Sequence, residues 1–276
     1  MRKRVRHRAG AIVWSTALAV AGVVAAPPPP ASAAGPVRAM TYNFCGAICN
    51  KGVVSKPGNN NDVVEDIRNR ILSTRPHLVM LQEACAGQYD RLKALLKGSG
   101  WSMDGVFRPQ RQDGRCKGSS RGFGDAVLTA GRVGGREVLD LPDLGSENRA
   151  ILCLNTDASG PVLACTLHLV TGRSGPGQKE HQRQLSSSAR LLNGRAAGRA
   201  VVVGGDFNAE PGRMAALLSS GKGGRFFDVD PRHAGTHGGK IDYVLFSRAH
   251  FSSPSGGPVN SKWSDHRILQ GGAARS

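Results

Sequence analysis

The sequence predicts a single α/β domain preceded by an export signal, and three observations lead to this prediction. Hydrophobic residues make up 39% of the 276 positions, enough for a sizeable core and too many for a disordered chain. Short apolar runs typical of strands alternate with segments of helical periodicity. The chain has no low-complexity linker and no repeat of roughly 20–50 residues that would divide it into smaller units.

Residues 1–33 have the pattern of a secretory signal peptide. A basic segment, an apolar stretch over 11–26 and the cleavage site Ala31-Ser32-Ala33 follow one another. A membrane anchor or a basic nucleic-acid-binding arm is the alternative. Removal of 1–33 leaves one domain over 34–276 and lowers the net charge from +17 to +12, because five basic and no acidic residues leave. We therefore expect a secreted, monomeric protein without stable membrane association, and its excess of basic charge favours an anionic partner.

The expected elements follow from local patterns. The first helix has Val64, Ile67 and Ile71 on one face and an Asn/Asp run as its N-terminal cap. The second and third helices each end at a glycine, which favours termination. The expected helices span 61–72, 88–97 and 178–193. The expected strands span 37–44, 77–82, 101–107, 123–130, 135–141, 149–156, 161–169, 200–204, 240–247 and 263–269.

All six cysteines lie after the expected signal peptide, at positions 45, 49, 85, 116, 153 and 165. An even number in an exported chain predicts disulfides, and zinc is the alternative, for which Cys45-x3-Cys49 lacks a matching second pair. Cys153 and Cys165 are equidistant from Ser159 in an expected hairpin and should face each other across it. The sequence supplies no such argument for the other four. Pairing Cys45–Cys49 with Cys85–Cys116 is a working hypothesis.

Polar residues able to do chemistry stand at the ends of several expected strands. They are Asn43, Glu83, His168, Asp206, Asn208, Asp242, Asp265 and His266. Active sites of sheet proteins gather at strand ends because the rigid sheet fixes loops that remain accessible. Each residue alone also has a structural explanation, such as a turn cap for Asn43, an ion pair for Glu83 or a satisfied core position for His168. The combination favours a catalytic site.

These residues together resemble the endonuclease/exonuclease/phosphatase superfamily, metal-dependent phosphoesterases that include pancreatic-type deoxyribonuclease. The matching segments, in the family's order, are Thr41-Tyr42-Asn43, Leu81-Gln82-Glu83, Thr166-Leu167-His168-Leu169, Gly205-Asp206-Phe207-Asn208, Ile241-Asp242-Tyr243 and Ser264-Asp265-His266. They span 41–266, nearly the whole chain after the expected signal peptide. The resemblance implies a four-layer α/β (α+β) sandwich, in which helices flank two packed, mainly antiparallel β-sheets.

Hydrolysis of a phosphodiester requires neutralised phosphate charge, an aligned water and a proton for the leaving oxygen. Glu83 is the best candidate metal ligand, because a hard carboxylate suits Mg²⁺ or Mn²⁺, with Ca²⁺ as a further option. The resemblance places Asn43 and Asp265 beside the same ion. Mg²⁺ keeps several waters, so a dense cluster of ligands is not expected.

The remaining strand-end residues are candidates for catalysis. Asp206 and Asn208 would share one face of an extended segment, and the resemblance places them near the attacking water and the scissile phosphate. The resemblance makes His266 the general base or a phosphate contact, with Asp242 orienting its ring. His168 matches the second histidine of the deoxyribonuclease-like branch, which would protonate the leaving group. Whether His266 or Asp206 takes the proton from water stays open.

Three further residues are candidates for phosphate or substrate contact. The resemblance places Arg149 where the family often has a phosphate-contacting arginine, and Thr236 precedes Asp242 much as in family members. Arg121 ends a basic loop over 108–121 that suits a phosphate backbone, although a solvated loop is the alternative. Asp125 is expected to support His168 from the adjoining strand.

The leading functional hypothesis is a secreted, divalent-metal-dependent endonuclease that cuts DNA with little sequence preference, and RNA is left open as a further substrate. Contacts to the phosphate backbone carry no base information, and no base-reading module is visible in the sequence. A secreted phospholipid phosphodiesterase of the sphingomyelinase kind ranks second, because aromatic residues for membrane docking make up only 5% of the chain. A phosphomonoesterase of the same superfamily ranks third. A catalytically silent DNA-binding subunit is disfavoured by the full set of polar residues.

Overall fold

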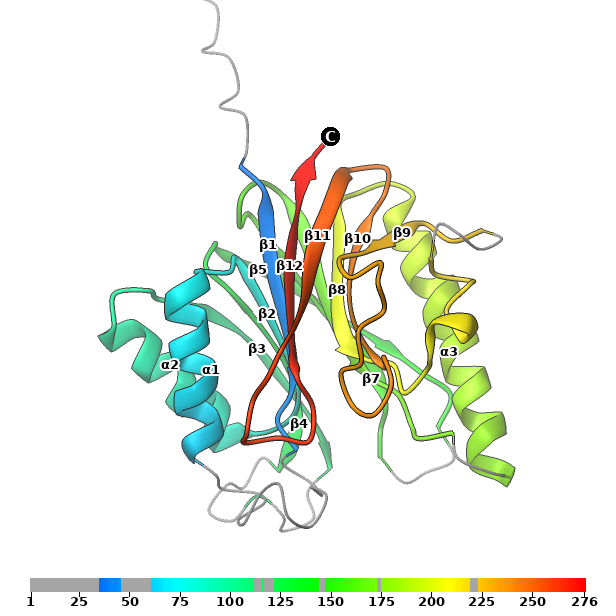
Figure 1. Cartoon of the computed structure of the whole chain (residues 1–276), viewed down its shortest axis with the longest axis horizontal. Coiled ribbons are helices and arrows are strands. Elements are labelled where there is room, and N and C mark those ends of the chain that lie inside the picture. The colour runs from blue at the N-terminus through cyan, green and yellow to red at the C-terminus, as the bar shows by residue number, and fades with distance from the viewer. Residues whose placement is uncertain are drawn as a thin grey trace, which may run out of the picture. The chain divides into compact units, whose positions relative to one another are not determined.

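The computed structural model describes residues 35–45, 61–111, 116, 122–143, 147–172, 175–218 and 223–276. Within these ranges the strands form two six-stranded sheets that pack against each other (Figure 1). The first sheet, in the order β11-β12-β1-β2-β4-β3, contains β1 (Val37–Asn43), β2 (Leu78–Cys85), β3 (Asp104–Arg111), β4 (Phe123–Thr129), β11 (Phe251–Val259) and β12 (Ile268–Arg275). The second sheet, in the order β5-β6-β7-β8-β10-β9, contains β5 (Val133–Asp140), β6 (Ala150–Thr156), β7 (Val162–His168), β8 (Val201–Asp206), β9 (Phe226–Asp228) and β10 (Asp242–Ser247).

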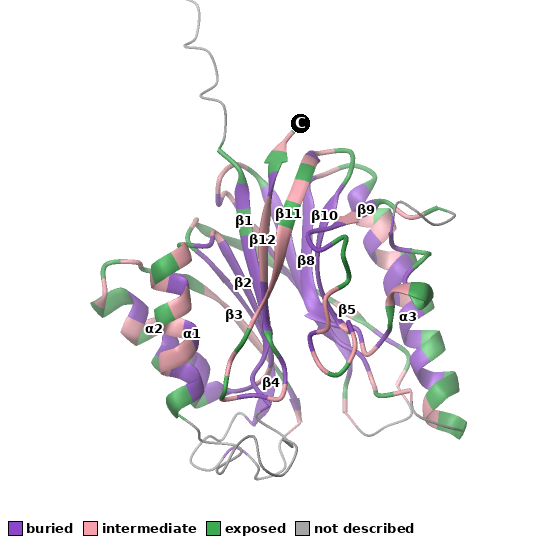
Figure 2. Ribbon diagram, viewed as in Figure 1, coloured by how far each residue is buried: buried purple, intermediate pink, exposed green. Residues whose placement is uncertain are grey.

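Three apolar layers join the sheets and helices. The helices are α1 (Asn61–Thr74), α2 (Ala86–Gly98) and α3 (Gly175–Ala196). Between the sheets, Met80 and Val127 of the first sheet pack with Val202 and Phe246 of the second. The other two layers join α1 and α2 to the outer face of the first sheet and α3 to the outer face of the second, and Figure 2 shows the buried residues along these contacts. Helices therefore flank both sheets, which confirms the expected four-layer sandwich.

Each sheet has one parallel strand pair near its centre. β1 runs parallel to β2, and β7 runs parallel to β8, while the other neighbouring strands are antiparallel. The carboxyl ends of parallel neighbours meet at the same edge of a sheet. In this fold, that edge of each sheet carries the polar residues described below.

The expected helices and most expected strands are present, and the main difference lies at the C-terminus. We expected one strand over 263–269, whereas the structure has β11 before that segment and β12 beginning only at its end, at Ile268. β11 contains Pro254 and Pro258, which the sequence pattern treats as breakers, but it pairs only with β12 at the sheet edge, where a missing N–H is tolerated. Gly271 belongs inside β12 because a Cβ there would lie 2.6 Å from the Ser255 carbonyl oxygen.

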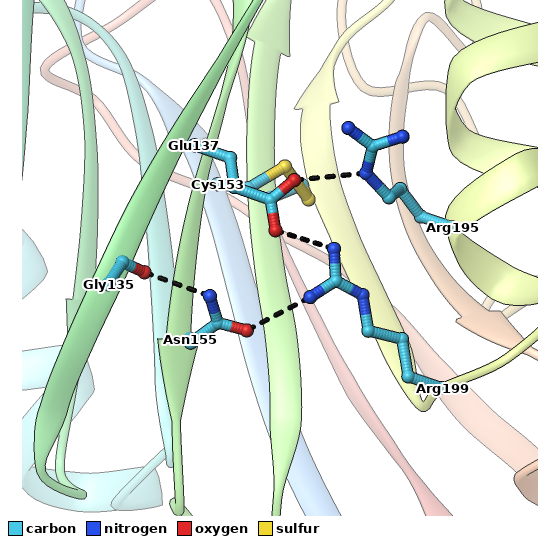
Figure 3. Close-up of a disulfide and its surroundings, with 7 residues drawn as sticks. Gly135, Glu137, Cys153, Asn155, Arg195 and Arg199 are labelled. Atoms are coloured by element: carbon cyan, nitrogen blue, oxygen red, sulfur yellow. Dashed lines mark hydrogen bonds and ion pairs between the residues drawn. A yellow bond between two sulfur atoms is a disulfide. The ribbon is translucent and has the colours of Figure 1, made fainter.

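Two disulfides join described residues. Cys153 and Cys165 are directly opposite each other on β6 and β7, with Cα atoms 4.1 Å apart, as the hairpin pattern predicts. Figure 3 shows this disulfide beside Glu137 of β5, whose carboxylate accepts hydrogen bonds from Arg195 in the last turn of α3 and from Arg199 after the helix. The Cys85–Cys116 pairing is also confirmed. Cys49, the other half of the Cys45–Cys49 hypothesis, lies outside the described residues.

In the part of the chain that the structure describes, no helix is both long and apolar enough to cross a membrane. The longest helix, α3, instead has a mixed character: its inner face buries Leu185, Ala189 and Leu192 against the second sheet, and polar residues occupy its outer face. This pattern is typical of a helix that covers a sheet in a globular domain.

Candidate active site

The strand register brings the polar strand-end residues to one edge of each sheet. Asn43 ends β1, and His168 and Asp206 end the neighbouring parallel strands β7 and β8, where they are direct partners. β10 runs antiparallel to β8, so its first residue, Asp242, lies opposite Asp206. His266 stands two residues before β12, which is antiparallel to β1. The tertiary fold therefore collects residues that are more than 200 positions apart in the sequence.

Asp206 is the centre of this group. Its Oδ2 accepts a hydrogen bond of 3.2 Å from Nδ2 of Asn43, and it lies 3.5 Å from Nε2 of His168 and 3.7 Å from Nε2 of His266. Asp206 is only 1% exposed. Burial and the nearby charge of Asp242 raise the pKa of Asp206 to about 7, against the opposing attraction of His266. The carboxylate of Asp206, at the end of β8, thus lies close to one amide and two imidazoles that stand at or next to the ends of three other strands.

Asn208 holds the loop after β8 rather than continuing the strand. Its backbone is left-handed, with φ +47°, so the segment is not extended through Asn208 as the sequence pattern predicts. Its N–H donates to Oδ1 of Asp206 at 2.9 Å, and its Nδ2 donates to the carbonyl oxygen of Leu169 at 2.9 Å. Asn208 therefore ties the end of β8 to the end of β7 and fixes one oxygen of Asp206. Strained non-glycine conformations of this kind concentrate at functional sites.

His266 is oriented by Asp242 and by the backbone around it. Nδ1 of His266 lies 2.9 Å from Oδ2 of Asp242. Burial opposes a charged ring, but the carboxylates of Asp242, Asp206 and Asp265 outweigh it and raise the pKa of His266 to about 10. The Oγ of Ser264 accepts from the N–H of His266 at 3.1 Å and donates to the carbonyl oxygen of Asn43 at 2.8 Å. These contacts fix both the ring and its place beside Asn43.

Thr236 acts on the backbone of the same region. Its Oγ1 accepts hydrogen bonds from the N–H groups of Ile241 and Asp242, at 3.2 and 3.1 Å. Thr236 is 1% exposed. Thr236, expected to contact substrate, is therefore buried and holds the backbone at the start of β10.

His168 has an environment opposite to that of His266. Its ring is buried, and burial together with the charges of Arg149 and His266 holds the pKa of His168 well below its usual value. Its Nε2 lies 3.9 Å from Oε1 of Glu83, in addition to its approach to Asp206. Among the described residues, Nδ1 of His168 has no hydrogen-bond partner. The two histidines thus share one carboxylate but differ in proton affinity.

Arg149 and Asp125 lie behind His168. Nη1 of Arg149 donates to the carbonyl oxygen of His168 at 3.0 Å, and Nη2 donates to Glu147. Oδ2 of Asp125 accepts a hydrogen bond from Nε2 of Gln110 at 2.5 Å. Asp125 makes no hydrogen bond to the ring of His168. Burial raises the pKa of Asp125 to about 8, although the charges of Arg149 and Arg108 oppose this shift. Arg121 lies outside the described residues.

Glu83 and Asp265 add further carboxylates to this edge. Glu83 has φ +51° at a register irregularity of β2, a local bend that turns a side chain out of the regular alternation. Its carboxylate is partly accessible, and so is that of Asp265, whose Oδ1 lies 4.0 Å from Nε2 of His266. Ligand atoms in two sets also lie within 4.8 Å of one another. The sets are His237, Asp265 and His266, and Asp206, Asp242 and His266.

The donor set fits a hard divalent cation. Oxygen atoms of carboxylates and amides are the preferred ligands of Mg²⁺ and Mn²⁺. Asp242 lies close enough to Asp206 that its negative charge contributes to the raised pKa of Asp206. A cation beside such carboxylates relieves their mutual repulsion. Of the residues expected to hold a metal, Asp265 belongs to one of the two sets of close ligand atoms, and Glu83 belongs to neither.

Several residues of the site were not identified from the sequence. Nε2 of Gln82 donates to Thr41 at 3.0 Å and to Thr166 at 2.8 Å, which links the two sheets below the site. The ring of His237 stacks on that of His266, with centroids 4.5 Å apart. A buried amide in an apolar strand needs partners, so Gln82 carried a usable signal. His237 carried none, because its position depends on how the 229–241 segment folds back.

A family model for the endonuclease/exonuclease/phosphatase family matches residues 40–266. The chain belongs to this family. Members of the family are phosphoesterases, generally dependent on divalent metals, so the chain is a phosphoric-ester hydrolase by membership. The matched range includes every residue of the site described above.

Solved structures of the family share the fold. The catalytic domain of human Nocturnin aligns with TM-score 0.66 and 19% identity, over 88% of this chain and 94% of that chain. A mannosyl-6-phosphatase from Bacteroides thetaiotaomicron aligns with TM-score 0.63 and 14% identity, over 86% and 99%. TDP2 from D. rerio, complexed with a single-strand DNA product, aligns with TM-score 0.63 and 15% identity, over 86% and 98%. A comparison with curated proteins produced no significant match.

Proposed function

We propose that this family member is a secreted, divalent-metal-dependent phosphodiesterase that cuts DNA with little sequence preference; whether it also cuts RNA is decided by the experiment below. The observation that carries the proposal is the arrangement around Asp206, whose Oδ2 approaches Asn43, His168 and His266 at once. A phosphoester at this edge would meet an acid–base group and several carboxylates in one place. Hydrolysis of a phosphodiester needs acid–base groups and a neutralised phosphate charge, which a cation held by the carboxylates would supply.

In this proposal, Glu83, Asn43 and Asp265 hold the cation. A bound divalent cation neutralises phosphate charge and polarises a phosphate oxygen. Oδ1 of Asn43 accepts the N–H of Cys45 at 2.8 Å, which fixes the amide in one orientation. The bend at Glu83 presents its carboxylate toward His168.

Asp206, His168 and His266 form the proposed acid–base group. The pKa of Asp206 is raised to about 7, which is close to the pH at which such a group must both take up and release a proton. The pKa of His168 is lowered and that of His266 is raised. Separation of the pKa values of neighbouring groups is typical of acid–base sites. Asp242 keeps His266 in place, and Asn208 keeps Asp206 in place.

A polynucleotide is the substrate class that best fits the charge of the chain. The net charge is +17, and remains +12 without residues 1–33. Basic charge without a base-reading element favours contact with the phosphate backbone, which is sequence-tolerant. Among the described residues the exposed large apolar side chains are Val133 and Val138, both on β5. A lipid phosphodiesterase needs a larger apolar surface to dock on a membrane, so it stays the second candidate.

Secretion is part of the proposal. The basic, apolar and small-residue segments in 1–33 follow the order of a signal peptide. The Cys85–Cys116 and Cys153–Cys165 disulfides fit an oxidising compartment. Expression of the full chain, followed by N-terminal analysis of protein in the medium, tests this point. A mature N-terminus at Ala34 is expected, and retention of the uncleaved chain inside the cell would contradict it.

The decisive experiment supplies the purified protein with plasmid DNA, RNA, sphingomyelin and a phosphomonoester, each with Mg²⁺ and with EDTA. We expect nicking of the plasmid that EDTA abolishes. The His266→Ala variant should cut at least about 10²-fold more slowly, and the exposed His233→Ala variant serves as the matched control. Turnover confined to sphingomyelin or to the phosphomonoester would overturn the nuclease proposal.

A further inference from the structure

A basic groove lies on the outer side of α3, next to the short helix η1 (Pro211–Arg213). It has a volume of about 540 Å³ and is lined by Gln178, Lys179, Gln182, Arg183 and Arg213. All five side chains belong to exposed residues, and three carry positive charge while none carries negative charge. Figure 2 shows exposed residues on the side of α3 that faces away from the sheet. The groove is therefore an accessible, positively charged surface.

One contact ties α3 to the site, and a second joins the two elements that line the groove. Nε2 of His181, on the buried side of α3, lies 2.9 Å from the carbonyl oxygen of Phe207, between Asp206 and Asn208. Nη2 of Arg213 lies 3.3 Å from Oε1 of Gln182, which joins η1 to α3. α3 follows β7, and η1 follows β8, the strands that end in His168 and Asp206. The groove thus lies on elements that directly follow the two strands carrying His168 and Asp206.

We propose that this groove binds the phosphate backbone of a polynucleotide beyond the phosphate that is cut. The inference rests on the proposed nuclease function and names a further substrate contact for it. Lys179 and Arg183 are four residues apart, about 6 Å along the helix axis, so both can face one stretch of backbone. Phosphates of one strand succeed one another every ~3.4 Å along the duplex axis, so the two cations can reach different phosphates.

Arg213 distinguishes this groove from the ordinary solvated face of a helix. Charges on one exposed helix face occur in most proteins, but Arg213 comes from a different element and meets the same groove through its contact with Gln182. The amides of Gln178 and Gln182 add groups that can hydrogen-bond phosphate oxygens. None of these groups reads bases in the groove of a duplex. The groove therefore favours long polynucleotides whatever their base sequence. A small phosphoester bound at the site would not reach it.

The test removes the three charges together in the variant Lys179→Ala/Arg183→Ala/Arg213→Ala. A matched control, Arg136→Ala/Arg232→Ala/Arg248→Ala, removes three exposed arginines on other elements. Binding of a labelled DNA duplex is measured in EDTA, where no cutting is expected, from about 50 to 200 mM salt. Turnover with Mg²⁺ is measured on plasmid DNA and on bis(p-nitrophenyl) phosphate, a small phosphodiester. Thermal unfolding is measured for every variant as a check that it is folded.

For the groove variant, we expect the slope of log binding constant against log salt to become less steep by about 2 to 3, at ~0.9 per lost phosphate contact. Plasmid cutting should fall at least about tenfold, while turnover of the small diester stays within about twofold of wild type. An unchanged slope, or an equal fall in the control variant, would overturn the inference. Failure of the wild-type protein to cut DNA while it hydrolyses another ester would instead overturn the proposed nuclease function.

Discussion

His266 presents Nδ1 to Oδ2 of Asp242 at 2.9 Å, and both side chains are buried at the edge where β10 begins. A buried carboxylate favours the protonated ring, which donates from both nitrogens. The pKa of His266 is accordingly raised to about 10, although burial alone would lower it. Asp242 therefore sets both the orientation and the charge of the ring that faces Asp206.

We expect Asp242→Asn to lower the pKa of His266, because the largest favourable charge is removed while the ring stays buried. The wild-type ring should remain protonated to about pH 10, and the variant ring should lose its proton at a lower pH. Turnover should fall by about 10–100-fold, as is typical for loss of an orienting carboxylate. NMR titration of the ring without added metal measures the shift. The control is Asp140→Asn, an exposed carboxylate on β5. An unchanged titration would contradict this assignment.

His168→Ala and His266→Ala should each lower turnover at least about 10²-fold, within the range for general acid–base groups. Both rings approach the same Oδ2 of Asp206, so they act as a unit. The double variant should therefore lose little more than the more damaging single variant. Steady-state kinetics on plasmid DNA measure the effect, with His233→Ala as the control. Rates near wild type for either single variant would remove that histidine from the acid–base group.

Asp125→Asn should stabilise the protein at high pH. The folded pKa of Asp125 is about 8, above the value of ~3.9 in an unfolded chain, so the folded state binds this proton more tightly. The favourable contribution is present below about pH 4 and is lost as pH rises to about 8. The asparagine keeps an oxygen for Gln110 but cannot ionise. The free energy of unfolding should therefore rise by at least about 1 kcal/mol at pH 8 and change little at pH 4.

Thermal or denaturant unfolding at several pH values measures the effect of Asp125→Asn. The matched control is Asp140→Asn, because Asp140 is exposed on β5. Equal gains at pH 4 and pH 8 would show that ionisation of Asp125 is not the cause. A loss of stability at pH 8 would show that the charge of Asp125 is favourable in the folded state.

His181→Ala should lower both stability and turnover. His181 is fully buried, and its loss leaves the carbonyl oxygen of Phe207 without that partner. An unsatisfied buried acceptor costs about 1–3 kcal/mol. Because Phe207 lies between Asp206 and Asn208, kcat should fall more than KM changes. Arg190→Ala, at an exposed position of the same helix, is the control. A change in KM alone would show that His181 does not position Asp206.

Local patterns in the sequence were sufficient for much of the fold. Alternation around Ser159 placed Cys153 opposite Cys165, because a hairpin register depends only on the residues between its strands. Helical periodicity placed Ile67 and Ile71 on the buried face of α1. β11 was not predicted, because its glycines and prolines are unfavourable in a strand until β12 provides a partner at the sheet edge.

For the site, the sequence by itself determined which residue types stand at strand ends and in what order. Their convergence on Asp206 was decided by the tertiary structure, because it requires two parallel strand pairs and packing of one sheet on the other. Tertiary contacts also decided the positions of Gln82, His237 and Arg213. These contacts join segments far apart in the chain, and no local propensity encodes them. Burial decided the direction of the pKa shift of His168, and neighbouring carboxylates decided that of His266 against burial; both causes exist only after folding.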